Sequence, residues 1–188
     1  LRDYEKPSRD AKRGMLPPKL AQIMIQLAGV SPATDTLYDP FCGTGTVLIE
    51  GLLQGYRSIG SDSSPEAIES TRENITWIQE KYTLPKETPT PQCFIARAEK
   101  VRASQLPTTP MVVVSETYLG PPQTLSTTID EAKKTLVKIE NLYEQVLNTL
   151  RAIPAIHTFV LAVPAYHIKN TWLYTNIIDR AQKSGYTV

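Results

Sequence analysis

Residues 37–49 read Leu-Tyr-Asp-Pro-Phe-Cys-Gly-Thr-Gly-Thr-Val-Leu-Ile. A short apolar run ends at Asp39, a small-residue loop with Gly43 and Gly45 follows, and an apolar helical pattern comes next. Glycine adopts positive φ angles and lets the backbone approach a ligand closely. The loop also leads into a helix N-terminus, where unpaired N–H groups collect. The stretch therefore predicts a strand, a glycine turn and a helix that bind a ligand, with Asp39 at the carboxyl end of the strand.

Residues 39–45, Asp-Pro-Phe-Cys-Gly-Thr-Gly, resemble the first motif of S-adenosylmethionine (SAM) dependent methyltransferases. Among these enzymes the string is most similar to the amino-methylating RNA and DNA enzymes, especially the tRNA guanine-N2 methyltransferases that carry a THUMP domain. In that family the acidic residue and the glycine loop hold the methionine end of SAM. The resemblance therefore implies a SAM site that contains Asp39, Phe41, Cys42, Gly43, Thr44 and Gly45.

A dinucleotide-binding Rossmann turn is the competing interpretation of the same loop. Its Gly-x-Gly-x-x-Gly spacing requires a third glycine at position 48, where this chain has Leu48. The spacing therefore argues against a dinucleotide site.

Length and composition indicate about one globular domain. The chain has 188 residues, of which 41% are hydrophobic and 21% charged, as is usual for globular proteins. No apolar run approaches the roughly 20 residues of a membrane span, and no signal peptide is visible. We expect a cytoplasmic protein without a membrane partner. Because the chain starts with Leu1 instead of Met, we also expect it to be a fragment of a longer protein.

The cysteine and histidine content does not indicate a metal site. Cys42 and Cys93 are too few for a disulfide framework or a zinc site. His157 and His167 lie near an apolar strand without ligand spacing around them. We therefore expect no metal ion.

Positive charge is concentrated at the start of the chain, although the net charge is only +1. The first 19 residues carry six basic and three acidic side chains, a net +3 that leaves −2 for the remainder. We expect residues 1–16 to form a basic arm, with Arg9, Lys12 and Arg13 contacting nucleic-acid phosphates. A solvated tail would explain the same charge equally well. Residues 17–188 are then the methyltransferase domain.

Apolar spacing predicts alternating strands and helices along that domain. Strands are expected at residues 36–39, 57–61, 93–96, 111–114 and 158–163, and helices from residue 17 and at residues 45–55, 64–81, 126–151 and 170–183. The alternation predicts an α/β fold, a Rossmann-like and mostly parallel sheet with helices on both faces. Residues 185–188 are expected to open a sixth strand. The family's sheet ends in an antiparallel hairpin, so the resemblance implies that these C-terminal hairpin strands are missing.

Two further segments supply candidate cofactor contacts. Asp62 ends the second predicted strand, where a carboxylate can accept hydrogen bonds from ribose hydroxyls. A helix N-terminal charge is the alternative role for this residue. Ser63 is expected to line the adenosine pocket. By resemblance, Ala98 and Glu99 after the third strand lie near the adenine amino group.

The segment after the fourth predicted strand decides the expected chemistry. Amino-methylating relatives carry Asp/Asn-Pro-Pro-Tyr/Phe here, in which the first residue binds the target amine and the aromatic ring stacks on the flipped base. An exocyclic amine is a poor nucleophile, so two acceptors that aim its lone pair at the SAM methyl group should assist transfer. This chain departs from the pattern with Ser-Glu-Thr-Tyr at residues 115–118. The expected catalytic residues are Ser115, Glu116 and Tyr118.

Three functions remain open from the sequence. The first is a SAM-dependent methyltransferase for an exocyclic amine of an RNA base, guanine N2 in tRNA, with an RNA-binding module upstream of Leu1. The second is a DNA adenine or cytosine amino-methyltransferase. The third is a SAM-binding module without catalysis, which the altered Ser-Glu-Thr-Tyr segment motivates. In the first two cases the target base would be flipped into the pocket.

Overall fold

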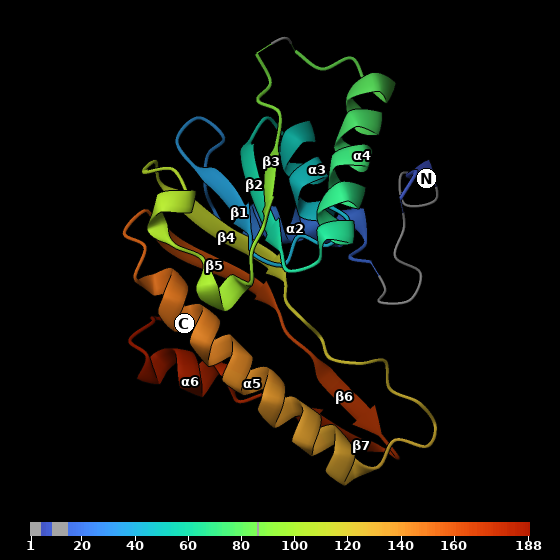
Figure 1. The fold of residues 1–188 in the computed structure, drawn as a ribbon. Helices are drawn as coiled ribbons and strands as arrows, with labels where there is room; N and C mark the ends of the chain where they lie inside the picture. Colours follow the sequence, from blue (N-terminus) through green and yellow to red (C-terminus); the bar gives the residue numbers. More distant parts are fainter. Residues whose placement is uncertain (1–4, 9–14, 86) are drawn as a thin grey trace.

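A five-stranded parallel sheet forms the centre of the molecule in the computed structural model, which describes residues 5–8, 15–85 and 87–188 (Figure 1). The strand order is β3-β2-β1-β4-β5. The strands are β1 (Thr36–Asp39), β2 (Arg57–Asp62), β3 (Gln92–Ile95), β4 (Met111–Glu116) and β5 (Ile156–Ala162). Every neighbouring pair in this sheet is parallel.

The two middle strands are buried on both faces. Strand β1 pairs with β2 on one side and with β4 on the other, so that Leu37 lies opposite both Ser58 and Val112. The side chains of residues 111–114 are completely buried. Such a continuous apolar run is typical of a parallel strand covered on both faces.

Helices cover both faces of the sheet, which confirms the predicted fold class. Helices α2 (Pro18–Leu27) and α3 (Thr46–Leu53) cover one face, and α4 (Pro65–Lys81) packs beside α3. Helix α5 (Ile129–Arg151) covers the opposite face, where Val146 and Leu150 contact Tyr38 and Val113. Short 3₁₀ turns, Ala98–Lys100 and Ala103–Gln105, connect β3 to β4.

The C-terminal part of the chain differs from the sequence prediction. The expected helix over residues 170–183 is wrong in its first half, where an antiparallel hairpin forms from β6 (Ala165–Ile168) and β7 (Thr171–Tyr174). Only α6 (Ile177–Lys183) is helical. The two turn residues, Lys169 and Asn170, have φ angles of 47° and 64°. Positive φ at both central residues is the geometry of a two-residue hairpin turn.

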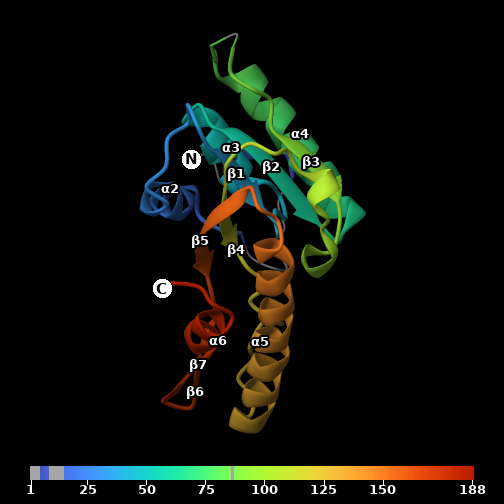
Figure 2. The same ribbon diagram turned by 90° about the vertical axis from the view of Figure 1, so that its left-hand side faces the viewer.

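The expected strand at residues 185–188 is also wrong. Gly185 takes a φ of 83° after α6, and the chain turns back so that the Tyr186 hydroxyl donates to the Leu147 carbonyl at 2.7 Å. The main sheet has five strands among the described residues. Figures 1 and 2 both show the hairpin and the N-terminal half of α5 extending together beyond the end of this sheet.

The described parts of the N-terminal segment pack on the domain. The Lys6 ammonium donates to the Thr46 hydroxyl at 2.9 Å, and Ser8 exchanges hydrogen bonds with the Asn74 side chain. Arg9, Lys12 and Arg13, the expected phosphate contacts, lie outside the described residues. Over the described part of the chain, none of the helices has the length and apolar character needed to cross a membrane.

Candidate functional site

A large groove of about 1240 Å³ opens at the carboxyl ends of the parallel strands. It lies where the strand order reverses between β1 and β4, the position at which open α/β sheets bind ligands. Its lining includes most of the residues expected at the site: Asp39, Phe41, Cys42, Gly43, Thr44, Asp62, Ser63, Ala98, Glu99, Glu116 and Tyr118. The fold thus brings together residues that follow four different strands.

The glycine loop connects β1 to α3 along one wall of the groove. Gly43 and Gly45 have φ angles of 53° and 84°, which L-residues with side chains rarely adopt. A Cβ on Gly43 would have only the Phe41 carbonyl nearby, at 4.0 Å, so the loop leaves open space there. Gly45 lies on the far side of the loop, where a Cβ would come within 2.9 Å of the Thr71 methyl group.

Two polar residues of α4 donate hydrogen bonds to the glycine loop. Neither of them was predicted from the sequence. The Thr71 hydroxyl donates to the Gly43 carbonyl at 2.7 Å, and the Asn74 amide donates to the Thr44 carbonyl at 2.9 Å. Both side chains are fully buried. The signal available in the sequence was polar residues at helix positions that share a face with Ile68 and Ile75.

Asp39 is buried at the floor of the groove. Its Oδ1 accepts hydrogen bonds from the Ser115 hydroxyl at 2.6 Å and from the Phe41 amide at 3.0 Å. Burial raises the pKa of this carboxyl group to about 7, and the nearby charges of Asp62 and Glu116 add to the increase. The two hydrogen bonds act in the opposite direction. Among the described residues, Oδ2 has no hydrogen-bond partner, so it can accept from a ligand.

Asp62 ties the glycine loop to the end of β2. Its Oδ2 accepts from the Gly43 amide at 3.1 Å, and its Oδ1 accepts from the Ser64 amide at 2.9 Å. A carboxylate offers about four lone-pair sites, so two remain for ligand hydroxyls. The neighbouring Ser63 is exposed at the same rim of the groove.

The 3₁₀ turn after β3 forms another part of the wall. Ala98 is buried there, and the Glu99 side chain is only 9% exposed. The Arg97 guanidinium donates to the Glu99 carboxylate at 2.6 Å. A partner for this carboxylate is therefore already present in the protein.

The three expected catalytic residues at the end of β4 and just after it differ from one another in their exposure to the groove. Ser115 is completely buried, and its hydroxyl bonds to Asp39 below the groove surface. Glu116 is half-buried on the groove wall, and burial raises the pKa of its carboxyl group. Tyr118 lines the groove with 51% of its surface exposed. Glu116, not Ser115, therefore offers the accessible polar group.

The remaining features of the groove concern thiol and metal chemistry. Cys42 is buried, and burial raises the pKa of its thiol well above the usual range. A buried thiol of this kind is chemically inert and contributes to packing. Within the described residues, no group of three or more His, Cys, Asp and Glu side chains is arranged to hold a metal ion.

Residues 6–84 match the protein family described as RMKL-like, methyltransferase domain. Two curated relatives are tRNA (guanine(10)-N2)-dimethyltransferases. The protein from Methanothermobacter thermautotrophicus is 50% identical over 62 residues, and the protein from Methanocaldococcus jannaschii is 40% identical over 84 residues. The matches cover 33% and 45% of this chain but only 18% and 21% of the relatives.

Two solved structures share the fold at low sequence identity. TrmN from Thermus thermophilus matches with a TM-score of 0.52 and 19% identity, over 92% of this chain and 42% of that protein. A protein from Methanobacterium thermoautotrophicum described as precorrin 8w decarboxylase matches with a TM-score of 0.55 and 17% identity, over 98% and 81%. Both likenesses support the fold assignment.

Proposed function

We propose, from the premise that residues 6–84 match an RMKL-like methyltransferase domain, that this chain is the catalytic domain of a SAM-dependent RNA methyltransferase. Its target is an exocyclic amine, guanine N2 in tRNA, as the names of the two curated relatives suggest. The observation that carries the proposal is one groove in which Asp39, Gly43 and Asp62 stand near Glu116 and Tyr118.

The groove residues fit SAM by their chemistry. Asp39 offers a carboxylate oxygen to the methionine ammonium group, and Asp62 offers acceptors to the ribose hydroxyls. The open space at Gly43 admits a ligand against the backbone, and Ala98 presents a small apolar surface near the base. SAM would supply an electrophilic methyl group on a positively charged sulfur.

The other end of the groove fits a planar base with an amino group. The half-exposed ring of Tyr118 can stack on the base, a contact worth about 1–3 kcal/mol. The Glu116 carboxylate can accept a hydrogen bond from the amine, and its raised pKa makes it a better acceptor for the proton that the nitrogen loses. Ser115 acts one step away, through its bond to Asp39.

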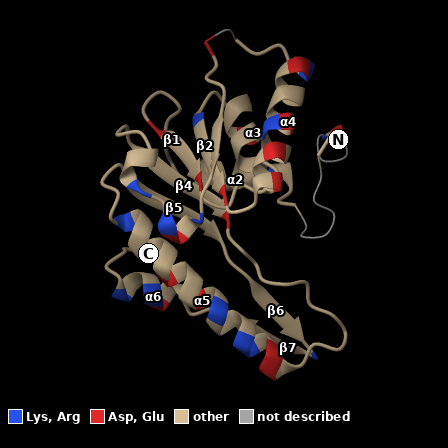
Figure 3. Cartoon of the chain, viewed as in Figure 1, with Lys and Arg blue, Asp and Glu red and all other residues tan. Residues whose placement is uncertain are grey.

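RNA affinity is proposed to come largely from outside the described groove. Figure 3 shows Lys or Arg positions (blue) and Asp or Glu positions (red) interspersed along α5, which therefore does not carry a run of basic residues alone. We therefore retain the basic N-terminal residues and a separate upstream RNA-binding module as the proposed phosphate contacts. We also retain the cytoplasm as the proposed location of the protein.

Calorimetry on Asp62→Ala tests the cofactor site. Loss of one charge-assisted hydrogen bond, about 1.5–3 kcal/mol, should weaken SAM binding roughly tenfold or more. Asp179→Ala removes an exposed carboxylate of α6 and should leave the affinity unchanged. Equal affinities for the two variants would exclude Asp62 from the site.

Transfer of a labelled methyl group from SAM by the full-length protein tests the reaction. We expect incorporation into tRNA and none into DNA, and Glu116→Gln should slow transfer at unchanged SAM affinity. Glu80→Gln, an exposed carboxylate on α4, serves as the matched control. Incorporation into DNA would favour the DNA amino-methyltransferase, and SAM binding without any transfer would favour the non-catalytic module.

A further inference from the structure

The short segment of residues 117–120 connects the end of β4 to the rest of the groove wall and carries the exposed ring of Tyr118. It has no regular secondary structure and no proline before Pro121. Its own backbone therefore leaves it free to adopt many conformations. A ring that stacks on a base needs a fixed position, so contacts from elsewhere in the fold must hold this segment.

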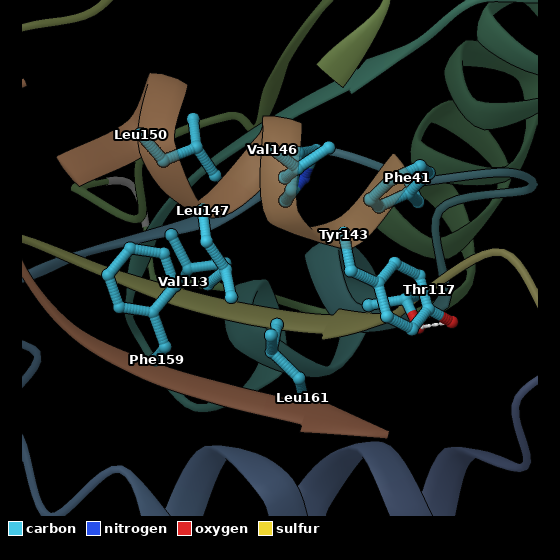
Figure 4. Close-up of a pocket in the computed structure, with 10 residues that line it drawn as sticks. Phe41, Val113, Thr117, Tyr143, Val146, Leu147, Leu150, Phe159 and Leu161 are labelled. Atoms are coloured by element: carbon cyan, nitrogen blue, oxygen red, sulfur yellow. Dashed lines mark hydrogen bonds between the residues drawn. The ribbon is translucent and has the colours of Figure 1, made fainter. Parts of the chain in front are cut away.

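Thr117 anchors the start of the segment to β5. Its amide and its hydroxyl both donate to the Ala162 carbonyl, at 3.2 and 2.8 Å. The same hydroxyl contacts the hydroxyl of Tyr143, a residue of α5. Figure 4 shows the Thr117 and Tyr143 side chains side by side, with Phe41 of the glycine loop close to them.

Two tyrosine hydroxyls then hold consecutive carbonyls of the segment. Tyr143 donates to the Tyr118 carbonyl at 2.8 Å, and Tyr166 of β6 donates to the Leu119 carbonyl at 2.6 Å. Both tyrosines are buried, with 2% and 7% of their surface exposed. Their rings lie among apolar side chains, where phenylalanine would pack without the cost of burying a hydroxyl.

Gly120 allows Tyr166 to approach this closely. It has a φ of 88°, and a Cβ there would collide with the Tyr166 hydroxyl and come within 2.8 Å of Ile139. Any residue with a side chain would therefore push the hydroxyl away from the Leu119 carbonyl. The glycine, the two tyrosines and the hairpin that carries Tyr166 form one arrangement around the segment.

We infer that Tyr143 and Tyr166 are positioning residues, whose hydroxyls fix the segment of residues 117–120 so that the Tyr118 ring faces the target base. The β6–β7 hairpin acts as a support for the groove wall through its inner face. This inference rests on the proposed function for the identity of the target, but the fixing of the segment stands on the hydrogen bonds alone.

The variants Tyr143→Phe and Tyr166→Phe remove one hydroxyl each and keep the ring. Tyr186→Phe is the matched control, because its hydroxyl also donates to a backbone carbonyl, that of Leu147, away from the groove. In the full-length protein we expect kcat/KM for tRNA to fall roughly three- to tenfold in the first two variants. The KM for SAM should stay unchanged, and the control should lose no activity.

Native-state proteolysis with chymotrypsin provides a readout that does not require activity. Cleavage after Tyr118 and Leu119 should accelerate in the first two variants, since local opening exposes the segment, while cleavage after the exposed Leu125 should not change. Unchanged cleavage in both variants, or an equal change in the control, would overturn the inference. If the wild-type protein methylates no nucleic acid, the proposed function fails, and the cleavage rates still decide whether the hydroxyls fix the segment.

Discussion

At the scale of single residues, the Asp39 carboxyl group combines burial with a set of competing interactions. Burial, Asp62 and Glu116 raise its pKa, and the bonds from Ser115 and Phe41 lower it, which leaves a value of about 7 against 3.8 in the unfolded chain. Between these two values the folded state binds more protons than the unfolded state. The contribution of Asp39 to stability therefore decreases as the pH rises through this window and is constant above it.

Asp39→Asn should remove this pH dependence, because asparagine stays neutral and can still accept the Ser115 hydrogen bond. Relative to the wild type, the free energy of unfolding of the variant should increase with pH between about 4 and 7. Each pH unit can contribute at most about 1.4 kcal/mol. Urea denaturation of the ligand-free chain at several pH values measures the difference. A difference that does not vary with pH would show that Asp39 ionises normally.

Gly43→Val should abolish SAM binding, because its branched side chain would fill the open space beside the loop and resist a positive φ. Gly55→Val is the matched control. Gly55 also has a positive φ, 83°, and open space where a Cβ would lie, but it does not line the groove. Both variants should lose stability from backbone strain, whereas calorimetry should detect SAM binding only in the Gly55 variant. Normal affinity in a folded Gly43 variant would contradict a role for the loop in binding.

At the residue scale, sequence motifs marked most of the residues that the structure places together in the groove. The acid and glycine-loop residues, Glu116 and Tyr118 were predicted from strand ends and from resemblance, and the fold brings them to one groove, although their roles remain predictions. The roles of Thr71 and Asn74 were not predicted. Their hydrogen-bond partners are carbonyls of the glycine loop, and the sequence alone does not show that this loop packs against α4. The burial of Ser115 depends on how β4 meets β1, which spacing along the chain does not reveal.

At the scale of elements, the clearest local signal is the start of α5. The Thr128 hydroxyl accepts from the Glu131 amide at 3.2 Å, and the Glu131 carboxylate accepts from the Thr128 amide at 2.8 Å, which forms a capping box. Thr128→Ala should reduce the free energy of unfolding by about 1 kcal/mol, and Thr128→Ser should restore it. Denaturant unfolding measures both values. A destabilised serine variant would mean that the methyl group, and not the cap, stabilises this end.

The predicted elements agree with the structure up to the end of β5, and the prediction fails beyond it. Strands β1, β3, β4 and β5 each contain a short apolar run. Helix α4 has its capping residue, Ser64, at the predicted start, and α5 has its capping residue, Thr128, two residues after the predicted start. The segment after β5 contains Trp172 and Tyr174, which favour strands, but its spacing also fits a helix. The segment forms a hairpin because Lys169 and Asn170 adopt positive φ angles in a tight turn. The pairing of β6 with β7 stabilises these angles, and the local sequence pattern does not reveal that pairing.

At the scale of the whole molecule, Asn74 connects the start of the chain to the groove. Its side chain donates to the carbonyls of Ser8 and Thr44, both at 2.9 Å, and accepts from the Ser8 amide at 3.1 Å. Asn74→Ala should lower the free energy of unfolding by about 1–3 kcal/mol and weaken SAM binding, since the glycine loop loses a support.

The control for this prediction lies on the same helix. Among the described residues, the Gln79 side chain bonds only to the Thr90 hydroxyl, at 3.0 Å and near the surface, so Gln79→Ala should change stability little. Denaturant unfolding and calorimetry compare the two variants. Equal losses of stability and of SAM affinity would show that Asn74 has no special connecting role.

The architecture of the whole molecule was predictable because alternating strands and helices permit few arrangements. A parallel sheet with helices on both faces follows from that alternation. The projecting unit of α5 and the β6–β7 hairpin was not predictable, because it depends on side-chain contacts between segments far apart in the chain, such as Tyr166 with Leu119.

The position of β1 between β2 and β4 also has a consequence for the order of folding. Ser115 and Asp39 are 76 residues apart in the chain, although their side chains bond directly. At a synthesis rate of about 5–20 residues per second, roughly 4–15 s separate their emergence from the ribosome. Strands β1 to β3 can pair in that interval. The other edge of β1, where the groove forms, remains unpaired until β4 has been synthesised. A nascent chain that stops before residue 111 would therefore expose the apolar edge of β1 to other chains and to chaperones.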